Sequence, residues 1–413
     1  MSTTDKYVTL YKPNISLVIP DQILEISDSE IVSITFIHNY DTMTYPIIRL
    51  RLYSDISVIQ SLCESPNDIE VRGDLLGMIY RMNDEDKSPK PISYVDEVSF
   101  KLKGYIENKN IPTSKFDQYV FGIKKSSDLN KNVKVPIEIF CYNDHMIHFM
   151  KQKTPAIYKG MSITSIITDM FTRNSIYNYS IDPLTNQNKY DQVLIPNLNI
   201  VESLGFFDKY YGMYTKGGQV YGEFDKIYVC NSDVVNGTKP IPIYVQHTKD
   251  NSDMSGMMQV GNKYQMITMA GNVAVNTETD IERVMNGKHL ADINLNTLQV
   301  NTEELKELFD STSSFAKLKN IETPNILHKS MNEYVASSYV ARLNENITKI
   351  DVSGCGFDIS KMKVNTRYNL VFATPIRGLD INKIYRPSYV CHVLSNLDSN
   401  LFMAQTTMNL RTN

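Results

Sequence analysis

The C-terminal segment of the chain has the clearest alternation of hydrophobic and polar positions. Between Phe402 and Arg411, one face carries Phe402, Ala404, Thr406, Met408 and Leu410, and the other face is polar. Strict alternation over this length is typical of a half-buried antiparallel strand. We therefore expect this strand to close a β-barrel whose other strands lie earlier in the chain, with Phe402, Thr406, Met408 and Leu410 as the closing residues.

A second alternating pattern, in residues 31–54, predicts a long hairpin. Two alternating runs flank the turn Asn39–Thr42, an arrangement typical of a β-hairpin. Residues before Ile31 show no comparable pattern, and we expect irregular structure there. Arg49 and Arg51 lie on the face opposite the core. The positions predicted to face the core are Val32, Ile34, Phe36, Ile48, Leu50 and Leu52.

Two segments in the middle of the chain have helical periodicity instead. The first helix is expected after Ser162, a suitable N-cap residue. Its apolar stripe is Ile163, Ile166, Ile167, Met170 and Phe171. The second helix is predicted over Val201–Tyr211 and ends at Gly212, and strands follow at Gln219–Cys230. This region therefore separates the first strand-rich segment from the last.

The order of these patterns predicts an α+β protein, mainly antiparallel β, with two tube-like β-barrels. We place the first barrel at residues 1–110 and a middle α+β domain at residues 111–215. The second barrel is expected from residues 216–250 and 345–413, because the strand pattern resumes after residue 345. Residues 251–344, which contain a capping box at Thr279–Glu282, are then a mixed α/β insertion.

Composition limits the classes of protein that fit. A length of 413 residues suggests two to four domains, and 42% hydrophobic residues are enough for sizeable cores. A net charge of -4 excludes a broadly basic nucleic-acid binder. The five cysteines are scattered without a C-x-x-C pair, which indicates free thiols in a reducing compartment. We find neither a signal-peptide pattern nor an apolar run of membrane-spanning length, so we expect no membrane partner.

The sequence contains no recognisable catalytic motif. His145 and His148, if on a strand, point to opposite sides, and so do Cys391 and His392. Gly354-Cys355-Gly356 lacks the third glycine of a dinucleotide site and is interpreted as a tight turn. We therefore expect no enzyme activity, no catalytic residues, no cofactor and no metal. The basic positions Arg49, Arg51, Lys101 and Lys103 fit either phosphate contacts or a solvated outer face of a sheet.

Two stretches resemble one protein family. Glu202–Tyr214 resembles the helix–glycine–aromatic segment of the late control protein D and VgrG spike family. The pattern over residues 334–411, a helix followed by strands, a glycine turn and a closing strand, is similar to the same family. Its best-known members are baseplate hub proteins of contractile-tailed phages.

The resemblance implies a structural hub rather than an enzyme. It implies a homotrimer whose two barrels per subunit form a pseudo-sixfold ring between the hexameric tail tube protein and the trimeric central spike protein. Tape measure and wedge proteins are further candidate partners, and DNA would pass transiently through the ring lumen. The expected location is the virion, at the tail baseplate, after assembly in the host cytoplasm. We expect Val32, Ile34, Phe36, Arg49, Leu50 and Arg51 to build the ring.

Two functions of other classes remain open. A tail-associated cell-wall hydrolase would need a Cys/His-centred or Glu-centred site, and the sequence singles out none. A host-binding tail protein would use the irregular segment 231–333 to contact a receptor.

Overall fold

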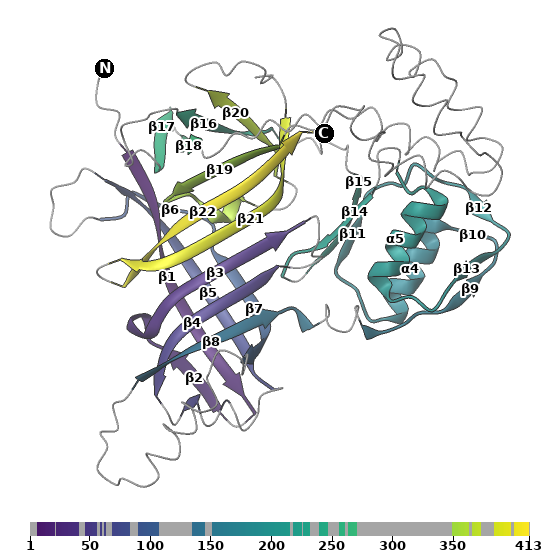
Figure 1. Cartoon of the computed structure of the whole chain (residues 1–413), viewed down its shortest axis with the longest axis horizontal. Helices are drawn as coiled ribbons and strands as arrows, with labels where there is room; N and C mark the ends of the chain where they lie inside the picture. Colours follow the sequence, from purple (N-terminus) through teal and green to yellow (C-terminus); the bar gives the residue numbers. More distant parts are fainter. Residues whose placement is uncertain are drawn as a thin grey trace, which may run out of the picture.

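The protein has a large body of β-strands and a smaller α/β domain beside it (Figure 1). The structure is a computed structural model. It describes residues 6–20, 22–40, 46–55, 58–59, 62, 68–82, 90–106, 134–144, 151–214, 218–224, 226–231, 239–246, 256–260, 263–270, 349–362, 366–372, 384–397 and 400–412. The predicted capping box at Thr279–Glu282 and the pair His145 and His148 lie outside these residues.

The large body is one 15-stranded sheet that closes on itself. Its N-terminal strands are β1 (Lys6–Ile19), β2 (Gln22–Ile26), β3 (Ile31–Asn39), β4 (Ile47–Asp55), β5 (Glu70–Arg81), β6 (Ser93–Tyr94), β7 (Val98–Ile106) and β8 (Lys134–Tyr142). Its later strands are β16 (Ile241–Gln246), β17 (Gly256–Val260), β18 (Lys263–Ala270), β19 (Lys349–Cys355), β20 (Tyr368–Phe372), β21 (Ile384–Leu397) and β22 (Leu401–Thr412). Two 3₁₀ turns, η1 (Asp28–Glu30) and η2 (Ile359–Lys361), complete it.

Strand pairing divides this sheet into two barrels. The first barrel runs β1-β5-β7-β8-β4-β3-β21-β22 and returns to β1, with every pair antiparallel. The second barrel runs β22-β19-β18-β16-β20-β21 and returns to β22. In it, β16 pairs in parallel with β18 and with β20. The predicted fold class, mainly antiparallel β with two barrels, is confirmed.

The hairpin β21–β22 belongs to both barrels. Its strands of 14 and 12 residues are long enough to extend along one barrel and continue into the next. On the inner face of β22, Phe402 and Ala404 pack in the first core, whereas Met408 and Leu410 pack in the second. All the predicted closing residues are thus buried, but Phe402 lies in the first barrel and not in the second.

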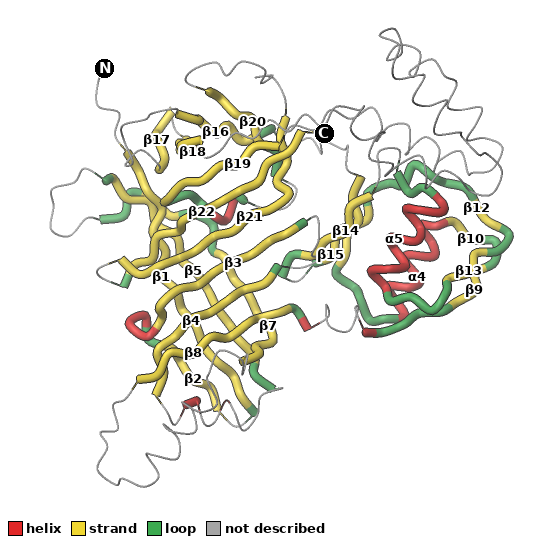
Figure 2. The backbone as a smooth tube through the Cα atoms, in the orientation of Figure 1, coloured by secondary structure: helices red, strands yellow, loops and turns green. Residues whose placement is uncertain are grey.

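In the described residues, the smaller domain contains two helices and three small sheets. The helices are α4 (Ile163–Arg173) and α5 (Ile200–Tyr211), which are red in Figure 2. The strands are β9 (Ala156–Tyr158), β10 (Met161–Ser162), β11 (Tyr179–Ile181), β12 (Lys189–Tyr190), β13 (Val193–Ile195), β14 (Gly218–Gly222) and β15 (Ile227–Asn231). The sheets are β10 with β12, β9 with β13, and β11-β15-β14, in which β11 and β15 are parallel. Ser162 caps α4 through its side chain, and Gly212 ends α5 in the left-handed conformation at φ 67°.

The domain boundaries differ from those predicted. Strand β8 lies in the first barrel rather than in the middle domain, because it pairs with β4 and β7. Strands β14 and β15 pair with each other, and β15 also pairs with β11 in the α/β domain, so neither strand joins the second barrel. Strands β17 and β18, expected within the insertion at 251–344, are part of the large sheet. In each case the pairing partner, which periodicity does not specify, decides the assignment.

Two predictions about the N-terminal segment were wrong. Residues before Ile31 form β1 and β2 rather than irregular structure, and β1 pairs with β5 along most of its length. Val32 does not face the core: it is 38% exposed, whereas Ile31 and Ile34 are buried. The register of β3 against β4 shifts between Ile31 and Ser33, and a bulge of this kind turns one side chain outward.

Candidate functional site at the barrel junction

A buried histidine–threonine pair marks the boundary between the two barrels. His392 on β21 and Thr406 on β22 are direct cross-strand partners. The His392 Nδ1 atom lies 2.9 Å from Thr406 Oγ1, and both side chains are buried. On the inner face of β21, Leu394 packs in the first core and Val390 in the second. The change from one core to the other therefore occurs at His392.

A second histidine faces this pair from β3. The ring centroid of His38 lies 6.4 Å from that of His392. Its Nδ1 atom is buried and has no hydrogen-bond partner among the described residues. Burial lowers the pKa of His38 to about 4. Burial, and to a smaller extent the nearby His38, lowers the pKa of His392 to about 3. Both imidazoles are therefore uncharged at neutral pH.

The α/β domain reaches this junction through the tip of its β14–β15 hairpin. Phe224, just after β14, packs with Phe36 and Phe100 at centroid distances of 6.0 Å each. Its ring lies 6.1 Å from His38, and its carbonyl accepts a hydrogen bond from the Asn143 side chain. At the other end of the hairpin, the Gln219 side chain donates to the carbonyl of Tyr40 at 3.1 Å. The hairpin thus connects the small domain to the barrel wall.

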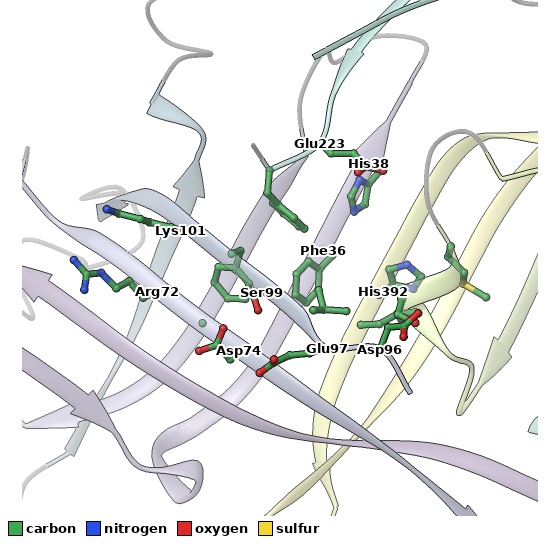
Figure 3. A pocket seen from close by; sticks show the side chains of 17 residues that line it. Phe36, His38, Arg72, Asp74, Asp96, Glu97, Ser99, Lys101, Glu223 and His392 are labelled. Carbon is green, nitrogen blue, oxygen red and sulfur yellow. The ribbon is translucent and has the colours of Figure 1, made fainter. Parts of the chain in front are cut away.

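These residues line a pocket with a volume of 580 Å³ (Figure 3). Its apolar part contains Phe36, Phe100 and Phe224, together with the imidazoles of His38 and His392. Gly73 on β5 lies against the ring of Phe100 and leaves no room for a Cβ. The polar residues around the pocket are Arg72, Asp74, Asp96, Glu97, Ser99, Lys101, Glu223 and Ser360.

The structure places the predicted ring residues on three different surfaces. Ile34 and Leu50 are in the first core, and Phe36 is both in that core and at the pocket. Val32 is exposed. Arg49 and Arg51 lie on the outer wall of β4, where both form ion pairs with Glu138 at 2.8 and 3.1 Å. The first hairpin therefore contributes to the barrel, while its role in a ring stays a prediction.

The outer basic positions are matched by carboxylates. Lys101 pairs with Glu70 at 3.3 Å, and Lys103 pairs with Asp144 at 3.4 Å. Arg49 also lies over the ring of Phe140, 5.0 Å from its centroid. These pairings agree with the interpretation of a solvated outer face rather than a phosphate-binding stripe.

The described residues hold no group of three or more side chains suited to a metal ion. Burial raises the pKa of Cys391, and this half-buried thiol is not positioned against His392, whose ring bonds Thr406. Gly356 has φ +69°, as expected of the tight turn predicted at Gly354-Cys355-Gly356. None of the described helices is long and apolar enough to cross a bilayer.

Sequence reasoning missed His38, Phe224 and the carboxylates around the pocket. These residues come from distant segments, and one local signal was the adjacent pair Cys391-His392, which was examined as a nucleophile and base. Gly73 gives a weak second signal, since an isolated glycine within a strand often marks a close approach.

Comparison with known proteins decides the family. The model of the family described as "Bacteriophage PBS1 gene 109 protein" matches residues 6–401. The chain belongs to this family. No curated protein matches it.

Solved structures similar to this PBS1 gene 109 family member include two tail proteins and a PdpA-VgrG complex. The tail protein from Neisseria meningitidis MC58 has 9% identity and a TM-score of 0.47, with 97% of each chain covered. The prophage MuSo2 43 kDa tail protein from Shewanella oneidensis has 9% identity and a TM-score of 0.41, with 96% of this chain and 97% of that chain covered. A Francisella PdpA-VgrG complex has 10% identity and a TM-score of 0.41, with 98% of this chain and 58% of that chain covered. The family match confirms the predicted relationship to a phage protein.

Proposed function

We propose that this protein is the structural baseplate hub of a contractile phage tail, a homotrimer that joins the hexameric tail tube to the trimeric central spike. The observation that carries the proposal is the fusion of two closed barrels in one chain through β21 and β22. Membership of a phage protein family supports the same conclusion.

The symmetry of a phage tail gives the physical reason for such an architecture. A six-fold ring cannot dock a three-fold spike directly, because equivalent patches would face non-equivalent partners. A trimer with two barrels per subunit offers six barrels to the tube and three subunits to the spike. The barrels would alternate around one ring, and DNA would pass through its lumen. Tape measure and wedge proteins are further proposed partners, and the proposed location is the virion.

The shared hairpin fixes the spacing that a ring requires. Because β21 and β22 run through both barrels, one barrel cannot tilt against the other without breaking the β21–β22 ladder. In the proposed ring, the outer pairs of Arg49 and Arg51 with Glu138 would hold β4 against β8. The α/β domain would lie outside the ring as a support.

An apolar patch on the first barrel is the proposed contact between subunits. Leu76 lies on β5, Met82 directly follows that strand, and Ile92 and Tyr94 lie on the segment paired with it; they are 40%, 50%, 50% and 65% exposed. Exposed apolar residues gathered in one place mark protein contacts more often than solvent-facing surface. A second copy of the chain would cover this patch in a homotrimer.

Mass measurement tests both the oligomeric state and the patch. We expect the purified protein to have three times the mass of one chain by light scattering, and the mass of the spike partner should add to this when the partner is bound. Leu76→Asp with Tyr94→Asp should lower this mass to that of the monomer. Tyr177→Asp is the matched control, because Tyr177 is 74% exposed in the α/β domain, away from the barrels. A monomer under all conditions would contradict the hub.

We also propose that the protein has no hydrolase activity. The hydroxyl that His392 bonds, on Thr406, is fully buried and so is closed to a substrate, and His38 Nδ1 has no partner among the described residues. A peptidoglycan gel should stay uncleared by the pure protein. Clearing that is lost with His392→Gln would show instead a cell-wall hydrolase.

A further inference from the structure

The carboxylates around the junction pocket have a feature that the hub proposal does not use. Asp74, Asp96 and Glu97 surround the pocket and form no ion pair among the described residues. Arg72 and Lys101 also line it, but both are bound to Glu70, which is outside the pocket. In Figure 3 the three carboxylates lie along one side and the two basic side chains lie apart from them. The unmatched charge at the pocket is therefore negative.

The interior of the pocket complements this negative rim. Phe36 and Phe100 meet edge to face at 5.8 Å, and Phe224 completes an aromatic surface suited to an aliphatic stem or a cation. Two imidazoles face the same space. Among the described residues, buried His38 Nδ1 has no hydrogen-bond partner, and the hydrogen bond to Thr406 engages only the Nδ1 atom of His392. Because both rings are uncharged at neutral pH, each can offer a lone pair and neither repels a cation.

We propose that this pocket binds a primary alkylammonium group on an aliphatic stem, with the ammonium near the carboxylates and imidazoles and the stem on the phenylalanine rings. A lysine side chain of an assembly partner supplies this chemistry, and so does a free diamine. An anionic ligand is disfavoured because the two cations at the pocket already share Glu70. The site lies within one chain, so it does not depend on the trimer.

Histidine ring signals give a direct measurement of binding. The chain has seven histidines, so labelled imidazole carbons yield few NMR signals, and His38→Gln and His392→Gln identify the two at the pocket. The probes are 1,5-diaminopentane, the peptide Ala-Ala-Lys-Ala-Ala, and the same peptide with norleucine in place of lysine. We expect both amines to shift the His38 and His392 signals and the norleucine peptide to leave them unchanged. The amine that binds with the lower Kd shows whether the natural ligand is a lysine side chain or a free diamine.

Charge removal tests the role of the rim. Asp74→Asn, Asp96→Asn and Glu97→Gln combined should weaken amine binding roughly tenfold, since each exposed pairing contributes little alone. Glu25→Gln on β2, an exposed carboxylate outside the pocket, is the control and should leave affinity unchanged. These surface changes should not disturb folding, and unchanged histidine spectra of the free variants would establish that. Equal affinity of the triple variant, or equal binding of the norleucine peptide, would overturn the proposal.

Discussion

The two barrels have cores of different chemistry. The first core is mainly aliphatic, and it includes Ile15, Leu17, Ile34, Ile48, Leu50, Leu52, Ile69, Val71 and Leu75. The second core contains Tyr40, Tyr221, Tyr368 and Tyr385, with Met266, Met362 and Met408. The first barrel also has longer strands: β1 and β5 have 14 and 12 residues, whereas β16 and β20 of the second barrel have 6 and 5.

This difference indicates that the second barrel depends on the first. Its longest strands, β21 and β22, already belong to the first barrel, and Tyr221 and Cys230 reach its core from the α/β domain. Short strands bury little surface of their own, so they need neighbours that are already ordered. The first barrel is thus the framework on which the second is completed.

The largest expected effect comes from placing a charge in the first core. Ile34 is fully buried, so Ile34→Asp would place an unpaired carboxylate among aliphatic side chains and should abolish soluble protein. Val32→Asp, two residues earlier on β3, should be tolerated because the bulge turns Val32 outward. Soluble yield and circular dichroism compare the two. Similar yields would show that the register of β3 is wrong.

Truncations on the shared strand separate the two cores. Phe402→Ala should cost about 3–5 kcal/mol and Met408→Ala about 2–5 kcal/mol, because each leaves a cavity in a different core. Amide hydrogen exchange shows which strands each truncation destabilises. Phe402→Ala should lower protection in both barrels, and Met408→Ala only in the second-barrel strands β16 and β20. The dependence of one barrel on the other would be refuted by the reverse pattern.

The histidines at the boundary should make stability depend on pH. Their folded-state pKa values, about 4 for His38 and about 3 for His392, lie below the unfolded value of about 6.5. The unfolded chain therefore binds more protons as the pH falls from about 6.5 to 4. The free energy of unfolding should decrease over this window by up to about 1.4 kcal/mol per pH unit for each histidine. Urea titrations of His38→Gln and His392→Gln should show a shallower dependence than the parent chain.

The smallest expected effect on stability comes from removing one of two buried tyrosine hydroxyls. In the first core, the Tyr11 hydroxyl accepts from the Ile359 amide at 2.8 Å, so Tyr11→Phe should cost about 1–3 kcal/mol by leaving that amide unpaired. In the second core, the Tyr40 hydroxyl is buried with no hydrogen-bond partner among the described residues. Tyr40→Phe should therefore be neutral or slightly stabilising. Thermal unfolding of both variants measures the difference, and a larger loss for Tyr40→Phe would contradict it.

Local hydrophobic patterns predicted the elements that have one buried face and one exposed face. The hairpin β3–β4, the closing strand β22, and the helices α4 and α5 were all expected from their periodicity, with Ser162 and Gly212 at helix ends. Strand β1 was missed because Pro13 and Asn14 interrupt its pattern. Pro13 is tolerated where β1 has one neighbour, since the pairing with β22 involves Leu10 and Tyr11 and that with β2 begins at Ile15.

The sequence by itself determined the buried face of the regularly patterned elements, such as β4, β22 and α4, because a period of two or 3.6 is a property of the local backbone. Only the tertiary structure decided which core receives them. Phe402 and Met408 share one face of one strand and enter different barrels, and His38, Phe224 and His392 meet from segments far apart in the chain. Strand partners and bulges are set by long-range pairing, which depends on the whole sheet rather than on any one segment.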